Sequence, residues 1–163
     1  MRTLAAGLAV LLCALPAVPV LADPGDGYGD GGDGASGDLS PQVRGLYDQG
    51  MDHVRAKRWA LAAAAFAQAV RAEPRFVEAW NMLGYAYRKL KDNTRALEAY
   101  RRALELRPDF KYAHEYIGRL YLAMGNRAQA MRHYEILRRL DATLAAQLLR
   151  AIEADNPDLG EPD

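Results

Sequence analysis

The fold of this chain is decided by one stretch, Trp80-Asn81-Met82-Leu83-Gly84-Tyr85-Ala86-Tyr87, and by the residues that follow it as far as Pro108. Its Trp, Leu, Gly and second Tyr recur at spacings of three and four residues, which places them on one face of a helix. Ala96, Tyr100 and Ala103 share one face of a second helix, after the polar break Lys91-Asp92-Asn93-Thr94. The stretch therefore predicts two helices joined by a short turn, with Trp80 buried between them.

The same pattern occurs again 34 residues earlier and 34 residues later in the chain. The aligned positions are Gly50, Gly84 and Gly118, then Ala62, Ala96 and Ala130, then Phe66, Tyr100 and Tyr134. Glycine and alanine let two helices approach closely, and the rings fill the space between them. The unit resembles the tetratricopeptide repeat, a helix–turn–helix motif that opens W-x2-L-G-x2-Y. The resemblance implies an all-α fold, an α-solenoid of three helix–turn–helix units plus a C-terminal capping helix, wound as a right-handed superhelix.

The repeat register gives the expected boundaries. We expect a repeat domain over residues 40–141, a capping helix over 142–156 and a frayed acidic tail over 157–163. Within the domain, the third repeat overlaps the cap, and the three units span 43–76, 77–110 and 111–144. Ser40-Pro41 is an N-cap followed by proline at the first helical position, and Pro74 and Pro108 end second helices. The helices are expected at 41–54, 59–72, 76–90, 93–106, 110–124, 127–140 and 142–154.

Residues 1–22 have the pattern of a secretory signal peptide, with one basic residue, an apolar run and a small-residue site that ends at Ala22. An uncleaved membrane anchor is one alternative. Lipidation of Cys13 is another, although Leu12 is larger than the residue that normally precedes a lipidated cysteine. Cys13 is the only cysteine, so cleavage after Ala22 would leave no thiol for a disulfide or a metal site. We therefore expect a periplasmic or secreted protein.

Residues 23–39 hold seven glycines and five aspartates, a composition that cannot form a core. We expect a disordered, acidic, Gly/Asp-rich linker. A calcium loop is the alternative, but the aspartates lack the register of an EF-hand. Residues 40–152 hold 20 Lys and Arg against 11 Asp and Glu, whereas both flanking segments are acidic. Occupation of a basic groove by the linker of the same chain is an alternative that the sequence leaves open.

In proteins of this family, the first helix of each repeat lines a concave groove that binds extended peptides. The resemblance implies that this groove is formed here by Arg44, Tyr47, Met51, Arg55, Asn81, Met82, Tyr85, Arg88, Lys89, Tyr112, Tyr116 and Arg119. Tyrosine, methionine and arginine dominate the set, and these residue types are enriched at protein interfaces. The alternative is that some of the tyrosines only pack between helices.

Several other functions are disfavoured. Family members that clamp chaperone tails use Lys, Asn and Arg at positions held here by Tyr47, Met51, Met82, Tyr112 and Tyr116. His53, His114 and His133 form no H-x-x-x-H pair, and no nucleophile motif or phosphate loop is present. We therefore expect no enzymatic activity, no metal and no cofactor, with His53 and His114 packed among apolar residues. Export and the acidic ends also argue against nucleic acid.

The predicted function is a non-enzymatic adaptor or scaffold of an exported bacterial protein, which binds a peptide segment of an envelope or secreted partner in its groove. A self-assembling, homo-oligomeric module of the cell envelope is the alternative. No membrane contact is expected once the signal peptide is removed. Replacing Tyr85 and Tyr116 by Ala is expected to abolish partner binding while preserving the helical content.

Overall fold

The computed structural model describes residues 39–160, and in this range the chain forms helices and no strand. The helices are α1 Pro41–Arg55, α2 Trp59–Ala72, α3 Val77–Lys89, α4 Asn93–Leu106, α5 Lys111–Ala123, α6 Arg127–Leu140 and α7 Ala142–Glu153. The helix bounds predicted from the repeat register lie within one residue of the observed ones, whereas the capping helix, expected to extend to residue 156, ends at Glu153. The predicted signal peptide and its cleavage site lie outside the described residues, and so does the linker up to residue 38.

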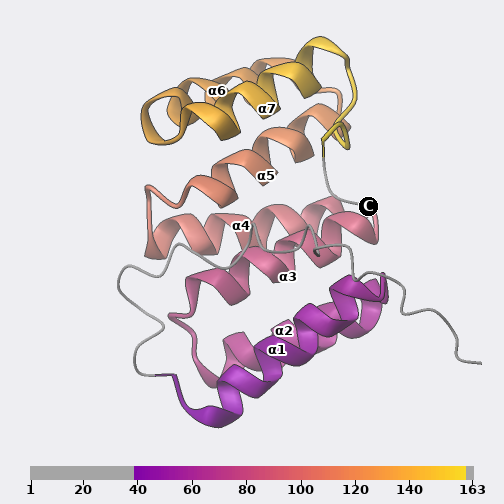
Figure 1. Ribbon diagram of the computed structural model, residues 1–163, viewed down its shortest axis with the longest axis vertical. Coiled ribbons are helices and arrows are strands. Elements are labelled where there is room, and N and C mark those ends of the chain that lie inside the picture. Colours follow the sequence, from indigo (N-terminus) through magenta and orange to yellow (C-terminus); the bar gives the residue numbers. More distant parts are fainter. Residues whose placement is uncertain (1–38, 161–163) are drawn as a thin grey trace, which may run out of the picture. The chain divides into compact units, whose positions relative to one another are not determined.

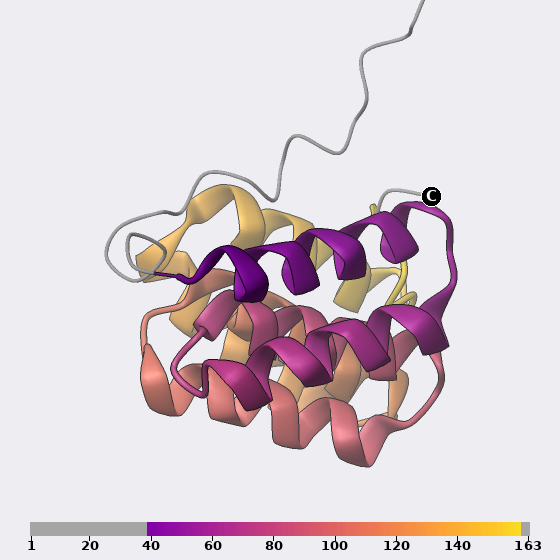
Figure 2. The ribbon, with the colours of Figure 1, turned by 90° about the horizontal axis from the view of Figure 1, so that it is seen from below.

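The helices stack as consecutive pairs along the chain (Figure 1). We call α1, α3 and α5 the A helices, and α2, α4 and α6 the B helices. Each A helix packs on the B helix that follows it, and each B helix packs on the next A helix. The last helix, α7, packs on both α5 and α6 at the end of the stack away from α1, so it lies behind the other helices in Figure 2. The predicted all-α solenoid with a capping helix is therefore confirmed.

Side-chain caps begin most of the helices. Ser40 accepts a hydrogen bond from the backbone N–H of Val43 at 3.3 Å, with Pro41 at the first helical position. The Asp92 and Asn126 side chains cap α4 and α6 in the same way. Asp141 caps α7 by accepting from two backbone N–H groups, and its carboxylate also bonds the Lys111 ammonium at 2.9 Å. These bonds satisfy N–H groups that have no partner within the helix.

A residue with positive φ ends each A helix: Lys57 at 54°, Lys91 at 63° and Gly125 at 73°. In each case the next N–H donates to a carbonyl five residues earlier, as between Asp92 and Tyr87 at 3.0 Å. This is the bond pattern of a Schellman turn, which reverses the chain sharply and favours glycine. The two lysines hold this backbone conformation without the freedom that Gly125 has.

The glycines of the repeat allow two helices to touch. A Cβ built on Gly50 or Gly84 would lie 2.5–2.7 Å from the ring of Phe66 or Tyr100 on the paired B helix. The predicted reason for these glycines is therefore confirmed in two repeats. In the third, a Cβ on Gly118 would instead meet the Leu148 side chain of α7 at 2.5 Å. The capping helix thus takes the place that an aromatic ring holds in the first two units.

Trp80 is less buried than the sequence predicted. Its side chain is only half-buried, and it packs at the edge of a cluster that joins α3, α4 and α5. Its indole N–H donates to the carbonyl oxygen of Pro74 at 2.9 Å. This bond requires the ring edge to reach the turn before α3, which keeps part of the ring at the surface. Trp80 therefore fastens the junction between repeats and is not a fully enclosed core residue.

Every helix from α1 to α7 contributes buried apolar residues, and these residues form separate clusters, one of which lies under the cap. Leu137, Leu148 and Ile152 are fully buried where α7 meets α6. Seven helices of 12–15 residues are too short to be stable alone, so this packing supplies most of the fold's stability. None of these helices, within residues 39–160, combines the length and hydropathy needed to cross a bilayer.

Candidate functional site

The twelve residues predicted to line the groove all lie on the A helices. We call the surface that carries them the A-helix face. Four come from α1, five from α3 and three from α5. Their exposure differs along the stack. Arg44 and Arg55 on α1 are exposed and Met51 is half-buried, whereas Tyr85 on α3 and Arg119 on α5 are 4% and 1% exposed. The open part of the face is therefore the first repeat.

All four tyrosines predicted to line the groove make ring contacts, including Tyr112, which lies beside Phe110. The ring centroids of Tyr85 and Tyr116 lie 5.3 Å apart and connect α3 to α5. Tyr116 also lies 5.8 Å from Tyr100 of α4. The ring centroids of Tyr47 and Phe76 lie 5.0 Å apart. Burial raises the pKa of the Tyr47 hydroxyl above its usual range. Tilted aromatic pairs of this kind stabilise packing beyond the area that they bury.

These contacts change how Tyr85 and Tyr116 should be interpreted. Both side chains are almost fully buried between helices, so they hold the A helices in place, in addition to any contact that they make with a partner. Replacing both by Ala would remove the aromatic link between α3 and α5 and leave cavities. The double substitution is therefore not a clean test of binding, and residues of the first repeat serve that purpose better.

Cations gather around Tyr85. The Arg88 guanidinium carbon and the Lys89 ammonium each lie 5.4 Å from the centre of the Tyr85 ring. Lys89 also lies 5.9 Å from the ring centre of Trp59, which itself contacts Tyr85 edge-on. Trp59 begins a B helix, so the family positions did not predict it. Its place beside Tyr85 adds an aromatic side chain to the A-helix face.

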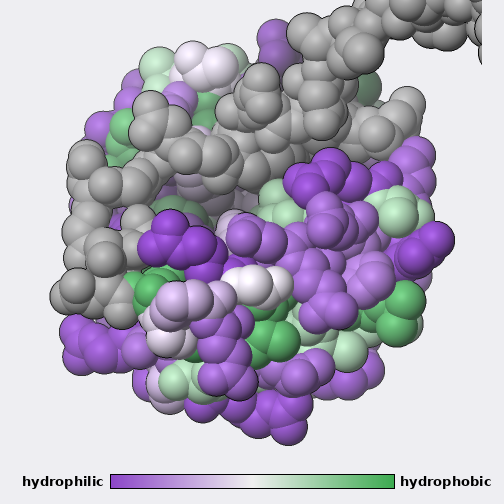
Figure 3. Space-filling view, turned by 60° about the horizontal axis from the view of Figure 1, so that its bottom comes forward, coloured by the Kyte–Doolittle hydropathy of each residue, from purple (hydrophilic) through white to green (hydrophobic). Residues whose placement is uncertain are grey.

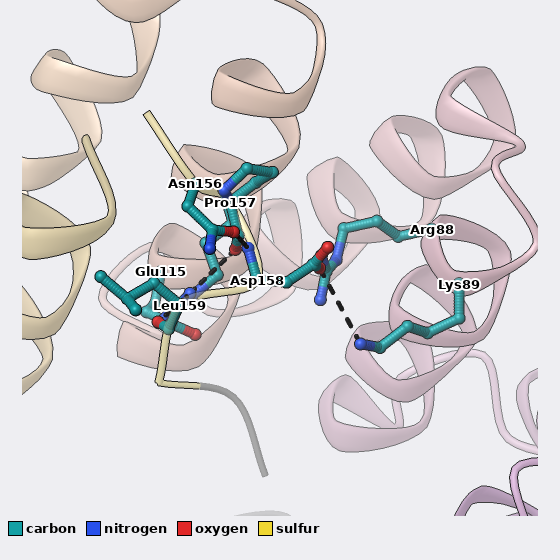
Figure 4. Close-up of polar contacts among 8 residues, drawn as sticks. Arg88, Lys89, Glu115, Asn156, Pro157, Asp158 and Leu159 are labelled. Carbon is teal, nitrogen blue, oxygen red and sulfur yellow. Dashed lines mark hydrogen bonds and ion pairs between the residues drawn. The ribbon is translucent and has the colours of Figure 1, made fainter. Parts of the chain in front are cut away.

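The C-terminal segment, residues 156–159, binds to this face (Figure 4). The Nη1 of Arg119 donates to the backbone carbonyls of Pro157 and Leu159, at 2.8 Å each. The Nη1 of Arg88 bonds the Asp158 carboxylate at 3.1 Å, and the Lys89 ammonium lies 3.9 Å from the same oxygen. The prediction of a frayed tail is therefore wrong for residues 157–159.

Glu115 holds the Arg119 side chain in place, because its carboxylate accepts a hydrogen bond from the Nε of Arg119 one helical turn away. Both side chains are buried. Burying a charged pair is costly unless its remaining hydrogen-bond capacity is used, and the two carbonyls of the C-terminal segment use it here. The sequence placed Arg119 on this face but gave no sign that residues 157 and 159 would be its partners.

Asn81 offers an additional polar group on the same face. It is 4% exposed, and its side-chain oxygen accepts no hydrogen bond from residues 39–160. A buried acceptor without a donor is uncommon and costs free energy. Asn81 and Arg88 are seven residues apart on one helix, so they lie about 10 Å from each other along its axis. A peptide N–H group is the kind of donor that Asn81 could use.

A histidine pair lies elsewhere, between α5 and α6. The predicted packing of His114 is confirmed, because it is buried. Its Nε2 lies 2.9 Å from the Pro108 carbonyl and donates to it, so in the neutral ring its Nδ1 accepts from His133 Nδ1 at 3.1 Å. Burial, and then the charge of His114, lower the pKa of His133 to about 4. Among residues 39–160, no cluster of three His, Cys, Asp or Glu could hold a metal ion.

Comparisons with known proteins agree with this architecture. Superkiller complex protein 3 of Mus musculus is 31% identical over 94 residues, which cover 58% of this chain but only 6% of the mouse protein. The first TPR of Spaghetti (RPAP3), bound to the HSP90 peptide SRMEEVD, superposes with a TM-score of 0.66 at 20% identity and covers 71% of this chain and 94% of that one. PcrH in complex with the chaperone binding region of PopD has a TM-score of 0.66 at 20% identity, covering 73% and 94%.

At 20% identity the two superpositions establish the fold alone. The family is shown more directly by sequence, since two profiles of the tetratricopeptide repeat match residues 47–109 and 112–142. These ranges include the glycines that contact Phe66 and Tyr100 and all three A-to-B turns. Residues 47–142 therefore belong to the tetratricopeptide repeat family.

Proposed function

We propose that this protein is a non-enzymatic interaction module that binds an extended peptide segment of an envelope or secreted partner on its A-helix face. The observation that carries the proposal is the pair of bonds from Arg119 to the carbonyls of Pro157 and Leu159. A side chain that bonds two backbone carbonyls of a non-helical segment can do so for many sequences. The face thus already holds a short peptide, supplied by its own chain.

Relatives of this fold support the proposal. The superposed domain of Spaghetti carries a peptide of HSP90, and PcrH carries a region of PopD. The residues on this chain's face differ from those of chaperone-tail clamps, so a different peptide is expected. Asn81 supplies a buried acceptor for a peptide N–H, while Tyr85 and Trp59 add aromatic surface beside the basic groups. The envelope location rests on the signal-peptide pattern of residues 1–22.

A peptide ligand also suits the polarity of the surface. On the side seen in Figure 3, hydrophilic residues predominate among those coloured, and hydrophobic ones are scattered between them. Permanent self-association generally uses a larger apolar area than this. The polarity of this side therefore favours a transient peptide partner there over the self-assembling alternative.

The test is photo-crosslinking in the native cell, with the reactive residue placed at Met51. This position is half-buried on the open part of the A-helix face. The matched control is Gln68, an exposed position on α2. The captured segment should then be synthesised and titrated into the labelled domain, and it should shift the NMR signals of α1, α3 and α5. Capture of the same chains from Met51 and Gln68, or shifts confined to the B helices, would contradict the proposal.

A further inference from the structure

The C-terminal segment reaches the A-helix face through a fixed turn. Asp155 has a φ of 50°, and the N–H of Asn156 donates to the carbonyl of Ala151 at 2.9 Å. The Asn156 side chain then accepts from the N–H of Asp158 at 3.0 Å. A Schellman turn followed by this second turn directs the chain back from the end of α7 toward α5 and α3. The segment is therefore presented to the face in one defined conformation.

Within residues 39–160, the contacts of the segment with the two arginines and Lys89 are of two kinds. The bonds from Arg119 go to backbone carbonyls and make no demand on side-chain identity. The bond from Arg88 goes to the Asp158 carboxylate, and Lys89 lies within ion-pair distance of the same oxygen. Arg88 is 5% exposed, so its charge is poorly solvated and favours an anionic neighbour. Recognition at this site thus combines a carbonyl pair with one acidic side chain between them.

We infer that the partner peptide is acidic, with an Asp or Glu between two residues whose carbonyls reach Arg119, and that it competes with Pro157-Asp158-Leu159 for the same two arginines. This inference rests on the proposed function, because it identifies the ligand class of that site. Residues 157–159 act as a tethered competitor that the partner must displace. The recognised carboxylate is a side chain within the peptide, so a free C-terminus is not required.

The expected strength of the competition follows from the tether. A segment joined to its site by a few residues has an effective concentration in the millimolar range. If the isolated segment binds the site with a dissociation constant of about 0.1 mM, any competing peptide should therefore bind about ten-fold more weakly to the full chain than to a chain lacking the segment. The inference thus predicts a difference that a titration can measure.

The experiment uses the chain's own segment as the probe. A fluorescent peptide with the sequence of residues 155–160, blocked at both ends, is titrated with the full chain and with a variant that ends at Asn156. Ending there keeps the N–H of Asn156, which closes the turn after α7. A single cooperative urea transition, at a midpoint lowered only by the lost contacts of residues 157–159, would show that the shortened variant is folded. Fluorescence anisotropy should give a dissociation constant at least ten-fold lower for the shortened variant.

Two altered peptides test the role of the negative charge without any change to the protein. The peptide with Asp158→Asn should bind the shortened variant at least five-fold more weakly. The peptide with Asp155→Asn, which removes the same charge at a residue that precedes the contacts, should bind as the original does. Failure of the shortened variant to bind the original peptide, equal affinity of both proteins, or equal effects of the two Asn changes would each overturn the inference.

The outcome is separable from that of the proposed function. An excess of the peptide should reduce the crosslinking yield at Met51 if partner and segment share the site. Partner capture at Met51 that the peptide does not reduce would overturn the inference and leave the proposed function standing. Tight peptide binding together with no partner captured at Met51 would count against the proposed function alone.

Discussion

Replacing Gly84 by Ala should destabilise the domain, although alanine is the better helix former. A Cβ at residue 84 would lie 2.7 Å from two carbons of the Tyr100 ring, well inside ordinary van der Waals contact. Tyr100 is fully buried, so its ring cannot move into solvent. Overpacking costs about 1–3 kcal/mol, and the better helix propensity of alanine recovers about 0.5–1 kcal/mol. The expected net loss is about 1–2 kcal/mol in the free energy of unfolding.

The matched control is Gly45→Ala on α1. Gly45 lies inside a helix, and a Cβ there would meet no atom within 4 Å. This substitution should therefore stabilise the domain by about 0.5–1 kcal/mol through helix propensity alone. Urea unfolding followed by circular dichroism at several protein concentrations measures both changes. An unchanged m-value would show that the difference lies in stability and not in the extent of unfolding.

A second substitution tests the named contact. Tyr100→Leu should shorten the clashing side chain, so the pair Gly84→Ala with Tyr100→Leu should lose less stability than the sum of the two single losses. The reasoning would be refuted if Gly84→Ala stabilised the domain as much as Gly45→Ala does. Strict additivity of the double variant would locate the cost somewhere other than the Gly84–Tyr100 contact.

Three further predictions concern turns, titration and capping. Lys91→Gly should stabilise the domain by up to about 1 kcal/mol, because glycine tolerates the positive φ at this turn, and Gly125→Ala should destabilise it by about 1 kcal/mol; urea midpoints would measure both. His133 has a pKa of about 4 in the folded state, against an ordinary 6.5, so the unfolded chain binds the proton first. Stability should therefore be complete above pH 6.5 and fall by about 1–3 kcal/mol between pH 6.5 and 4, and His133→Gln should flatten that slope in urea titrations at each pH. Asp141→Ala should cost about 1–2 kcal/mol by uncapping α7 and removing the bond to Lys111. Thr143→Ala, two residues further on, should cost little, and thermal melts would measure both changes.

The sequence predicted the fold closely because several helix boundaries have a local chemical cause. Ser40, Asp92 and Asn126 are N-caps, and side-chain oxygens define where their helices begin. The repeat glycines indicate where two helices must touch. Trp80 was less predictable, because a motif position indicates a neighbour but not how much of the ring that neighbour covers. Its half-exposed state depends on the bond to Pro74, which no spacing reveals.

The candidate site was predicted in outline only. Helical periodicity tells which face a residue lies on, and all twelve predicted residues do lie on A helices. Periodicity does not tell what covers that face. Burial of Arg119 depends on Glu115 one turn away and on carbonyls about 40 residues later in the chain. Backbone carbonyls carry no sequence signal, so their role as ligands of an arginine could be found only in three dimensions.

The structure also determines where binding can be tested by mutation. Removing Arg119 would break its buried ion pair with Glu115, a change that typically costs about 3–5 kcal/mol. Such a variant would lose binding because it loses its fold, and the result would not identify a contact. Changes on the peptide avoid this difficulty, because they leave the buried pair intact. Changes at Arg44 and Arg55 avoid it too, since both side chains are exposed on α1. The face that holds the C-terminal segment is therefore best examined from the ligand side, and the open first repeat from the protein side.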